Sequence, residues 1–317
     1  MLPVEHWLSI AALALEACLG YPQWLYSRIA HPVVWMGNLI ETLERRWNDV
    51  TRTDGARRFL GMVAVMIVAG SAATIGWVVQ RGASHLPFGG WIVALIATTG
   101  LAQRSLYIHV SDVLRPLMLG DLHAARTAVG HIVGRDTAEL THAGVAAAAL
   151  ESLAESFNDG VVAPAFWLLV GGLPGLFAYK ALNTADSLIG HREPRWRMFG
   201  WAAARADDVA NLLPARIAGF LLAATGGAGL RIMFRDASKH ASPNAGWPEA
   251  ALAGALDVRL GGPATYDGAL HERPIFGDGA APDAEDLARG LRTYVRACAL
   301  LWVLAALLSL GSTLWPR

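Results

Sequence analysis

Long apolar stretches alternate with shorter polar ones along most of the chain. A helix needs about 20 apolar residues to cross a bilayer, and four stretches reach that length: Phe59–Gln80, Pro87–Val110, Val161–Leu182 and Val295–Trp315. Trp7–Leu19 and Leu212–Leu230 are weaker candidates, and the Ala-rich stretch His142–Phe157 could cross or lie against the others. The pattern predicts an all-α integral membrane protein, a polytopic helical bundle with polar loops and amphipathic or re-entrant helices.

Trp7–Leu19, the apolar stretch nearest the N-terminus, is predicted to be a retained helix rather than a signal peptide. It has no basic segment before it and no Ala-x-Ala cleavage site, and it carries Glu16.

Basic residues predict the orientation of the chain in the membrane, because Lys and Arg collect in short cytoplasmic loops. Residues 41–58 hold five arginines, whereas Arg81 stands alone in the next loop. We therefore expect residues 41–58 to be cytoplasmic, and residues 111–141 to return to that side two crossings later. If the stretches 142–157 and 161–182 form a hairpin, residues 183–208 are cytoplasmic as well.

The chain is expected to form a single membrane-embedded domain, residues 1–317, with a polar Gly/Pro-rich insertion at 231–294 before the last helix. Within the insertion only Pro248–Val258 has a helical pattern, with proline in the first turn. The side of residues 231–292 stays open, because it depends on whether Leu212–Leu230 crosses fully or re-enters.

Composition narrows the function classes. The 317 residues are 54% hydrophobic and 16% charged, with 26 basic and 26 acidic side chains, and no basic block resembles a nucleic-acid footprint. Cys18 and Cys298 lie far apart, and the histidines are scattered without an HExxH motif. No nucleic-acid partner and no protein-bound zinc or haem are expected.

Ionisable residues gather between Glu151 and Arg216, among segments apolar enough to enter a bilayer. Glu151, Glu155 and Asp159 recur at i, i+4 and i+8, and Asn158 falls on the same side of a helix. Such like charges persist when a cation, an arginine or a raised pKa relieves their repulsion, and an oxygen cluster suits Mg²⁺. A solvated helix face is the alternative. Charges near hydrocarbon more often mark a functional site.

Two further clusters are predicted at a membrane boundary. Asn183 and Asp186 follow an apolar stretch, and Arg205, Asp208 and Asn211 recur some twenty residues later. Asp207 and Asp208 diverge by about 100° on a helix. We favour Asp208, which shares a face with Arg205, although either could be a ligand. Helix capping and ion pairing explain each cluster equally well when it is taken alone.

Six ordered blocks, spread over nearly the whole chain, resemble one family. They are HPVVWMGNLIE (31–41), GRDTAEL (134–140), ESLAESFNDGVVAPAFW (151–167), YKALNTADSLIGHRE (179–193), FGWAAARADDVANLLPAR (199–216) and SPNAGWPEAALAGALDVRLGGPATYDG (242–268). The family is the membrane-bound adenosylcobinamide-phosphate synthases of cobalamin biosynthesis, CobD/CbiB. Two positions depart from its usual pattern: Tyr21 replaces an aspartate and Ser156 an asparagine. A catalytic role at position 21 is therefore not expected.

The resemblance implies an amide ligase that condenses adenosylcobyric acid with aminopropanol or its O-phosphate. ATP would supply the driving force and Mg²⁺ would be the metal cofactor. The implied partners are the corrinoid, the amino alcohol (phosphate) and the lipid bilayer. A homo-oligomer or contact with other cobalamin-pathway enzymes stays open. The implied location is the cell (inner) membrane, multi-pass, with the active site facing the cytoplasm.

Candidate roles are assigned on the residues that match these blocks. Catalytic candidates are Glu151, Glu155, Asp186 and Asp208; metal candidates are Glu151, Glu155, Asp159, Asp186, Asp207 and Asp208. Substrate-binding candidates are Asn158, Asn183, Arg135, Arg205, Asn211 and Arg216. The arginines are expected to hold phosphate or carboxylate.

Two other functions compete with this one. An intramembrane Mg²⁺-dependent prenyltransferase would bind diphosphate through Asn-x-x-Asp and Asp-x-x-x-Asp motifs. Asn183-x-x-Asp186 fits only in part, since Gly190 stands where the second motif needs an acid. A non-catalytic AmpE-like membrane sensor could keep the helices and lose the acids, but this chain retains them.

Overall fold

The computed structural model describes residues 7–21, 28 and 30–314, with side chains described up to residue 310. These residues form two compact units. The first unit draws on the segments up to Ala102, from Ala163 to Asn211 and from Ala305 onward, and the second on Gln103–Val162 and Leu212–Leu304. The predicted single membrane-embedded domain stays a prediction beside this division.

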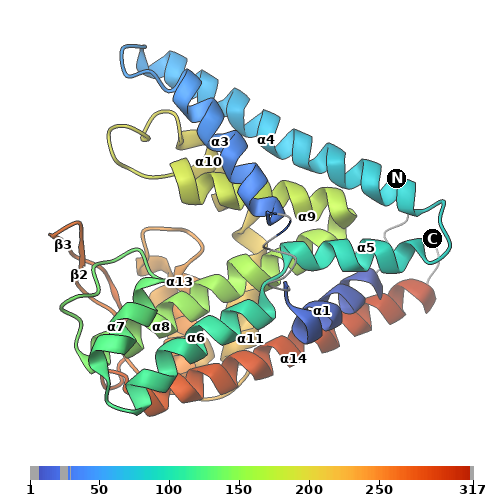
Figure 1. The fold of residues 1–317 in the computed structure, drawn as a ribbon. Coiled ribbons are helices and arrows are strands. Elements are labelled where there is room, and N and C mark those ends of the chain that lie inside the picture. The colour runs from blue at the N-terminus through green and yellow to red at the C-terminus, as the bar shows by residue number, and fades with distance from the viewer. Residues whose placement is uncertain (1–6, 22–27, 29, 315–317) are drawn as a thin grey trace. The chain divides into compact units, whose positions relative to one another are not determined.

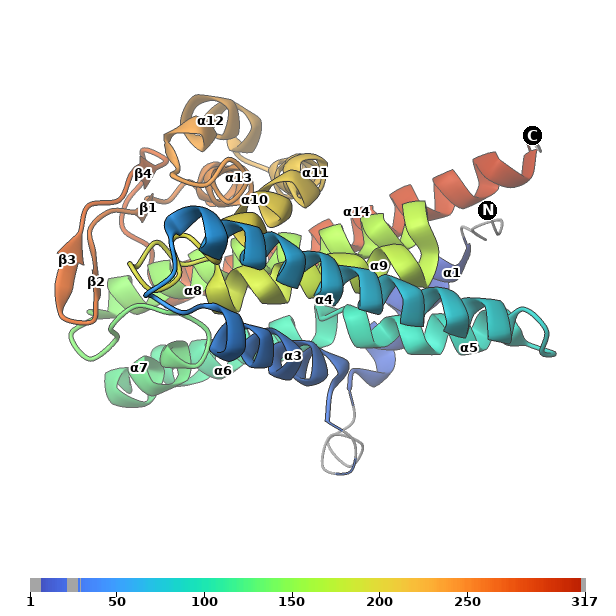
Figure 2. The same cartoon turned by 90° about the horizontal axis from the view of Figure 1, so that it is seen from above.

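The first unit is a layer of helices built around two long ones (Figure 1). Its elements are α1 (Trp7–Leu19), α3 (Pro32–Trp47), α4 (Asp54–Ala83), α5 (Gly89–Ala97), the 3₁₀ turn η1 (Thr98–Gly100), α9 (Ala163–Ile189) and α10 (Trp201–Ala210). Helix α4 packs along α9, and α3 and α10 each pack against both of them. Figure 2 shows α3 and α4 side by side in a second view.

The second unit combines helices with short strands. Its helices are α6 (Gln103–Met118), α7 (Leu122–Gly130), α8 (His142–Phe157), the π-helix η2 (Asn158–Val162), α11 (Leu212–Ala223), α12 (Gly229–Asp236), the 3₁₀ turn η3 (Ala237–Lys239), α13 (Gly246–Leu256) and most of α14 (Ala284–Leu314). Helix α13 packs against α8, α11 and α12 at the centre of this unit.

Four short strands form two antiparallel pairs in the polar segment of the second unit. β1 (Leu260–Gly261) pairs with β4 (Ile275–Phe276), and β2 (Ala264–Tyr266) pairs with β3 (Ala269–His271). The register sets Leu260 opposite Phe276 and Thr265 opposite Leu270. Both pairs lie inside the predicted insertion, whose helical part is confirmed as α13.

The predicted all-α membrane protein is confirmed. Four helical segments are long and apolar enough to cross a membrane: Asp54–Ala83, Gly89–Met118, His142–Ile189 and Ala284–Leu310. Each contains or overlaps one of the four predicted stretches. Helix α4 has both of its expected start signals, since the Thr53 side chain accepts from Ala56 N–H and Asp54 lies in the first turn. Large apolar side chains of α4 such as Met66, Ile75 and Trp77 are exposed, as expected for a lipid-facing surface.

The predicted stretch 161–182 contains a break in the helix at Gly172. Gly172 adopts φ +62°, where glycine is favoured, and the next amide, Leu173 N–H, donates to Gln80 Oε1 at 2.8 Å. A Cβ added at Gly175 would lie 2.5 Å from the Trp167 carbonyl oxygen. Residues eight apart in a straight helix are about 12 Å apart along its axis. The chain therefore reverses at Gly172, and α9 is itself a helical hairpin.

The hairpin between 142–157 and 161–182, on which the expected side of residues 183–208 depended, does not form at that connection. Helix α8 continues through η2 into α9, and the reversal comes only at Gly172. A π turn holds one extra residue per turn, which lets the helix continue with a shifted face.

The stretch Leu212–Leu230 is divided into two short helices. Helix α11 ends at Ala223, and Gly226 and Gly227, both with positive φ, make the turn into α12. Its 12 residues give α11 a length of about 18 Å, against roughly 30 Å for the hydrocarbon core of a bilayer. Helix α11 alone is too short to span.

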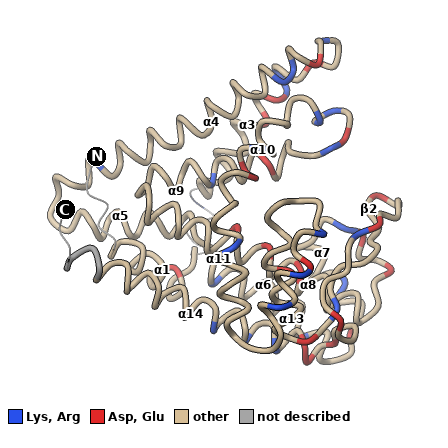
Figure 3. The backbone as a smooth tube through the Cα atoms, turned by 180° about the vertical axis from the view of Figure 1, so that it is seen from behind, with Lys and Arg blue, Asp and Glu red and all other residues tan. Residues whose placement is uncertain are grey.

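Charged residues are concentrated in particular segments of each unit (Figure 3). In the first unit they mark the α3–α4 connection and the segment leading into α10, whereas α5 carries none. In the second unit they mark the loop after α7 and the segment around β2.

Candidate functional site

A buried carboxylate held by two guanidinium groups forms the centre of the candidate site in the second unit. Glu151 lies in α8, and only 4% of its side chain is exposed. Its Oε2 accepts a hydrogen bond from Arg135 and a second from Arg273 Nη1 at 2.9 Å. Gly261 N–H donates to Oε1 at 2.8 Å. Charge-assisted bonds of this kind are about twice as strong as neutral ones.

Two segments far apart in the sequence bring these donors together. Arg135 comes from the loop after α7, and Arg273 from the connection between β3 and β4. Asp136 N–H donates to the Thr265 carbonyl at 2.9 Å, and Gly268 N–H donates to Asp136 Oδ2 at 2.8 Å. The β2–β3 hairpin is therefore bonded to the loop that carries Arg135. We call Arg135, Glu151, Arg273 and Glu249 the glutamate–arginine cluster.

Glu249 is the second carboxyl of this cluster, and its side chain is only 3% exposed. It lies in the first turn of α13, where Oε2 is 3.8 Å from Arg273 Nη2 and Oε1 is 3.8 Å from His240 Nε2. Neither distance is a hydrogen bond. Among the described residues, none donates a hydrogen bond to Oε2. Burial raises the pKa of Glu249 well above its ordinary value, and the negative charges of Glu151 and Glu155 raise it further.

The remaining predicted residues of α8 and η2 differ in exposure. Glu155 is exposed, Asn158 is buried and Asp159 is half-buried. Asn158 Nδ2 donates to Asp159 Oδ1 at 2.7 Å. The π turn begins at Asn158, so the regular i, i+4, i+8 spacing of a straight α-helix ends before Asp159.

A chain of hydrogen bonds joins predicted residues of the first unit, and we call it the amide network. Asp207 accepts from Asn183 Nδ2 at 3.4 Å and from Asn211 Nδ2 at 3.0 Å. Tyr179 O–H donates to Asn211 Oδ1 at 3.1 Å, and Lys180 Nζ donates to Asn183 Oδ1 at 3.2 Å. The structure thus brings Asp207, rather than the favoured Asp208, into contact with both asparagines.

Asp208 instead pairs with Arg205 at 3.0 Å, and 56% of the Arg205 side chain is exposed. Asp186 is half-buried in the last turns of α9. A Cβ at Gly190 would lie 1.9 Å from Asp186 Oδ1. An aspartate at position 190, which a second Asp-rich prenyltransferase motif would need, would therefore collide with Asp186.

Arg216, in α11 of the second unit, lies over the Trp247 ring at 4.6 Å from its centroid. Its Nη1 donates to the Leu212 carbonyl at 2.6 Å and to Asn244 Oδ1 at 3.1 Å. These contacts fix the guanidinium by stacking and hydrogen bonding. The role of Arg216 in substrate binding stays a prediction.

The predicted metal ligands are divided between the two units: Glu151, Glu155 and Asp159 lie in the second, and Asp186, Asp207 and Asp208 lie in the first. Within the described part of the chain, no three His, Cys, Asp or Glu side chains are grouped so that they could hold a metal ion. Two guanidiniums and an amide occupy Glu151, two amides occupy Asp207, and Arg205 pairs with Asp208. The arrangement therefore does not fit a preformed Mg²⁺ site made of protein carboxylates alone.

Four residues of these two sites were absent from the sequence-based candidates: Glu249, Arg273, Lys180 and Tyr179. Glu249 lies in the SPNAGWPE block, and Tyr179 and Lys180 open the YKALNTADSLIGHRE block, so the blocks were the signal that could have found them. Arg273 lies outside all six blocks. It is separated from Glu151 by 122 positions in the sequence, so no local pattern could show the contact.

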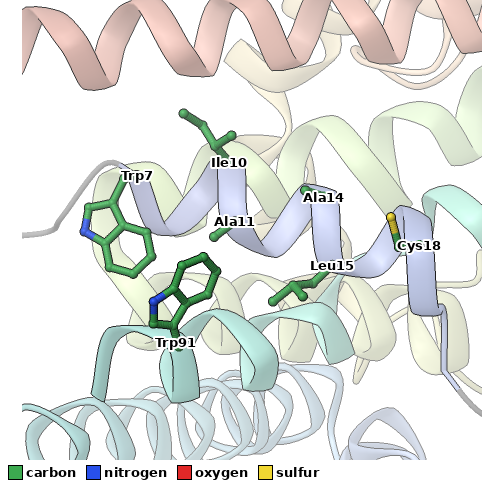
Figure 4. A pocket seen from close by; sticks show the side chains of 7 residues that line it. All are labelled: Trp7, Ile10, Ala11, Ala14, Leu15, Cys18 and Trp91. Carbon is green, nitrogen blue, oxygen red and sulfur yellow. The ribbon is translucent and has the colours of Figure 1, made fainter. Parts of the chain in front are cut away.

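The first unit also has an apolar groove of about 400 Å³ between α1 and α5 (Figure 4). It is lined by Trp7, Ile10, Ala11, Ala14, Leu15, Cys18 and Trp91. The two tryptophan rings face one another at one end, 5.3 Å between centroids. None of the lining side chains is a carboxylate or a basic group. The groove shares no lining residue with the amide network of the same unit and suits an apolar neighbour.

Comparison with known proteins identifies the family. The description of the matching family is CobD/CbiB protein, over residues 9–294. The chain is 48% identical over 301 residues to the cobalamin biosynthesis protein CobD of Rhodobacter capsulatus, covering 92% of this chain and 93% of the relative. It is 45% identical over 302 residues to the CobD of a Sinorhizobium species (92% and 94% covered), and 42% identical over 304 residues to that of Rhizobium meliloti (92% and 93% covered). No solved structure gives a significant match. A family match over most of the length, with such identities, means that the chain belongs to the CobD/CbiB family.

Proposed function

We propose that this protein is a biosynthetic enzyme of cobalamin formation that joins adenosylcobyric acid to aminopropanol, or to its O-phosphate, through an ATP-driven amide bond. The relatives are named as cobalamin biosynthesis proteins. The observation that carries an enzymatic role is the glutamate–arginine cluster. Buried charges are costly, and a membrane protein that only bound or sensed would have little need of them.

The proposed reaction has two bond-forming steps. A carboxylate oxygen of the corrinoid attacks the γ-phosphorus of ATP, which gives an acyl phosphate and releases ADP. The amine nitrogen, after its ammonium loses a proton, attacks the acyl carbon, and inorganic phosphate leaves as the amide forms. Arg135 and Arg273 are suited to hold the anionic groups, because guanidiniums bind carboxylate and phosphate in the same planar geometry.

In this proposal, Mg²⁺ binds together with the phosphates of ATP. Proteins commonly bind Mg²⁺ through one or two carboxylates together with substrate phosphates. The described carboxylates form no three-ligand group. No step of the proposed reaction therefore depends on a metal held by the protein alone.

The proposed active site faces the cytoplasm. The bonds of Asp136 to Thr265 and Gly268 support this orientation, because they hold the β2–β3 hairpin beside the loop that follows α7. Two polar segments in direct contact lie on the same side of a membrane. The short α11 agrees, since a helix of about 18 Å re-enters more readily than it crosses. The loop after α7 belongs to residues 111–141, which are expected on the same side as residues 41–58, two crossings earlier. The arginines of residues 41–58 predict that this side is the cytoplasm.

Cysteine labelling tests the orientation. Cys18 and Cys298, the two native thiols, are replaced by serine, and Asp267 at the exposed hairpin tip is changed to cysteine. A membrane-impermeant maleimide is expected to label this variant in inside-out vesicles and to leave it unlabelled in right-side-out cells. Arg81→Cys, in the last turn of α4, is the control and should show the opposite pattern. Labelling of Asp267→Cys from outside would contradict the orientation.

Complementation and direct assay test the activity. Purified wild-type protein should convert adenosylcobyric acid, aminopropanol phosphate and Mg-ATP into a corrinoid whose mass corresponds to the amide. Asp208→Asn and Glu155→Gln should each abolish cobinamide production while the protein stays in the membrane. Asp112→Asn is the matched control for Asp208, because Asp112 also forms an exposed i, i+3 pair, with Arg115 at 3.4 Å. Wild-type yield from the first two variants would refute their roles.

A further inference from the structure

The charges of the glutamate–arginine cluster are unevenly compensated. Glu151 receives both guanidiniums and a backbone amide. Glu249 has Arg273 Nη2 and the imidazole of His240 at 3.8 Å each, and the more remote charge of Arg135 also acts on it. Two arginines therefore face two buried glutamates, and both arginines make their hydrogen bonds to the same one. Exposed Glu155, on α8, adds a further negative charge that acts on Glu249.

A buried carboxyl without a hydrogen-bond donor is costly. The penalty for a buried polar group without a partner is about 1–3 kcal/mol, and it is larger for a charged one. Among the described residues, none donates to Glu249 Oε2. A ligand that supplies donors and positive charge at this point would recover that free energy on binding.

We propose that Glu249 receives a primary ammonium group, so that the glutamate–arginine cluster contains the subsite for the amine substrate. An ammonium brings three donors and one positive charge. It needs only one or two acceptors, whereas a metal ion needs a convergent ligand group, and none is found in the described part of the chain. This inference rests on the proposed function, because it assigns the amine of that reaction.

Arg273 connects the two ends of this subsite. Its Nη1 bonds Glu151 at 2.9 Å, and its Nη2 faces Glu249 at 3.8 Å. One guanidinium thus separates a position suited to an anion from a position suited to a cation. A carboxylate or acyl phosphate on the arginine side and an ammonium on the Glu249 side would be close neighbours, which is what amide formation requires.

Direct binding tests the subsite without any need for turnover. The purified full-length protein, in lipid nanodiscs, is titrated with 1-amino-2-propanol and, separately, with 1,2-propanediol, which lacks the amine. Wild type should bind the amine at least about tenfold more tightly than the diol, as expected for a desolvated charge pair. Glu249→Gln should remove that preference. Glu272→Gln is the control. Glu272 is an exposed glutamate between β3 and β4, and this variant should retain the preference for the amine.

Kinetics separate this role from a purely structural one. In the ligase assay, Glu249→Gln should raise KM for the amine at least about tenfold and leave KM for adenosylcobyric acid and ATP within about twofold. Equal rises in all three constants would indicate a structural role and overturn the proposal. If Glu249→Gln fails to fold, the preference of wild type for the amine over the diol still decides: equal affinities overturn the subsite.

Two other outcomes are informative. Mg²⁺ alone is titrated as a third probe, and loss of Mg²⁺ binding in Glu249→Gln with amine binding intact would show a metal ligand and overturn the subsite. A wild-type protein that makes no amide yet binds the amine through Glu249 would refute the proposed ligase and support the ammonium subsite. The two hypotheses therefore fail separately.

Discussion

The two units of the molecule hold polar groups among apolar helices in contrasting ways. In the first unit, the amide network runs from Lys180 to Tyr179, and each bond is between 3.0 and 3.4 Å long. In the second, charge faces charge, and Glu249 lacks a hydrogen bond at Oε2. A satisfied network makes a rigid core and gains little from a ligand. An unsatisfied carboxyl gains much, so the comparison assigns a scaffold role to the first site and ligand binding to the second.

The largest expected effect is that of Glu151→Gln. Removing one partner of a buried ion pair costs about 3–5 kcal/mol, because the other charge stays buried. Here two arginines, with 12% and 17% of their side chains exposed, would lose their carboxylate. We expect a marked fall in the free energy of unfolding in detergent, followed by tryptophan fluorescence, together with loss of amide formation.

Glu155→Gln is the matched control on the same helix. Glu155 is exposed one turn after Glu151, and surface substitutions usually change stability by less than about 0.5 kcal/mol. It should lose activity and keep stability. If both variants are destabilised equally, the buried pair is not what distinguishes the second unit.

Asp207→Asn, which has the next largest expected effect on stability, tests the amide network. Asp207 accepts from two asparagine amides, and an amide in its place would turn a donor toward donors. The expected loss is about 1–3 kcal/mol in the free energy of unfolding. Asp208→Asn, which removes the half-exposed pair with Arg205, should cost less than about 1 kcal/mol. Equal losses would show that the network is not the stabilising element of the first unit.

Length and apolar composition were enough to predict the helical class and, among the described residues, the four helical segments that are long and apolar enough to cross a membrane. They could not predict the reversal at Gly172, because glycine is common in membrane helices and only the backbone angle shows its use here. They also could not show that α8 continues into α9 without a turn, since the π turn η2 that connects them has no sequence signature as clear as a helix cap.

Periodicity identified the acids of the site but not their partners. Glu151 was found because its spacing to Glu155 and Asp159 repeats along a helix, and Asp207 because it adjoins Asp208, which is local information. Arg273 reaches Glu151 across 122 residues, and Asn183 reaches Asp207 across 24. Such contacts depend on how strands and helices pack. The contact of Asp207 with Asn183 could not be predicted for the same reason, because it depends on how α9 packs against α10.

The pH dependence of the unfolding temperature of Glu249→Gln tests the contrast between the two units. The pKa of Glu249 is raised by burial above its ordinary value of 4.5. A raised carboxyl pKa contributes stability that is present below the unfolded value and lost as pH rises through the folded value. Without ligand, wild type should therefore unfold at a lower temperature than Glu249→Gln at pH 8, by a few degrees. That gap should narrow toward pH 4.5. A constant gap would mean that ionisation of Glu249 has no effect on stability.

The smallest expected effect has the opposite sign and belongs to the first unit. Burial and the nearby charge of Lys180 lower the pKa of His31 below its ordinary value of 6.5. A lowered pKa contributes stability that is present above 6.5 and lost as pH falls through the folded value. Neutral Nδ1 also accepts from Val33 N–H at 3.3 Å at the start of α3, and a protonated ring cannot. Asparagine is a good N-cap at every pH. The unfolding temperature of wild type should therefore fall more than that of His31→Asn between pH 7.5 and 5.5, and parallel curves would show that His31 is not the acid-sensitive group of the first unit.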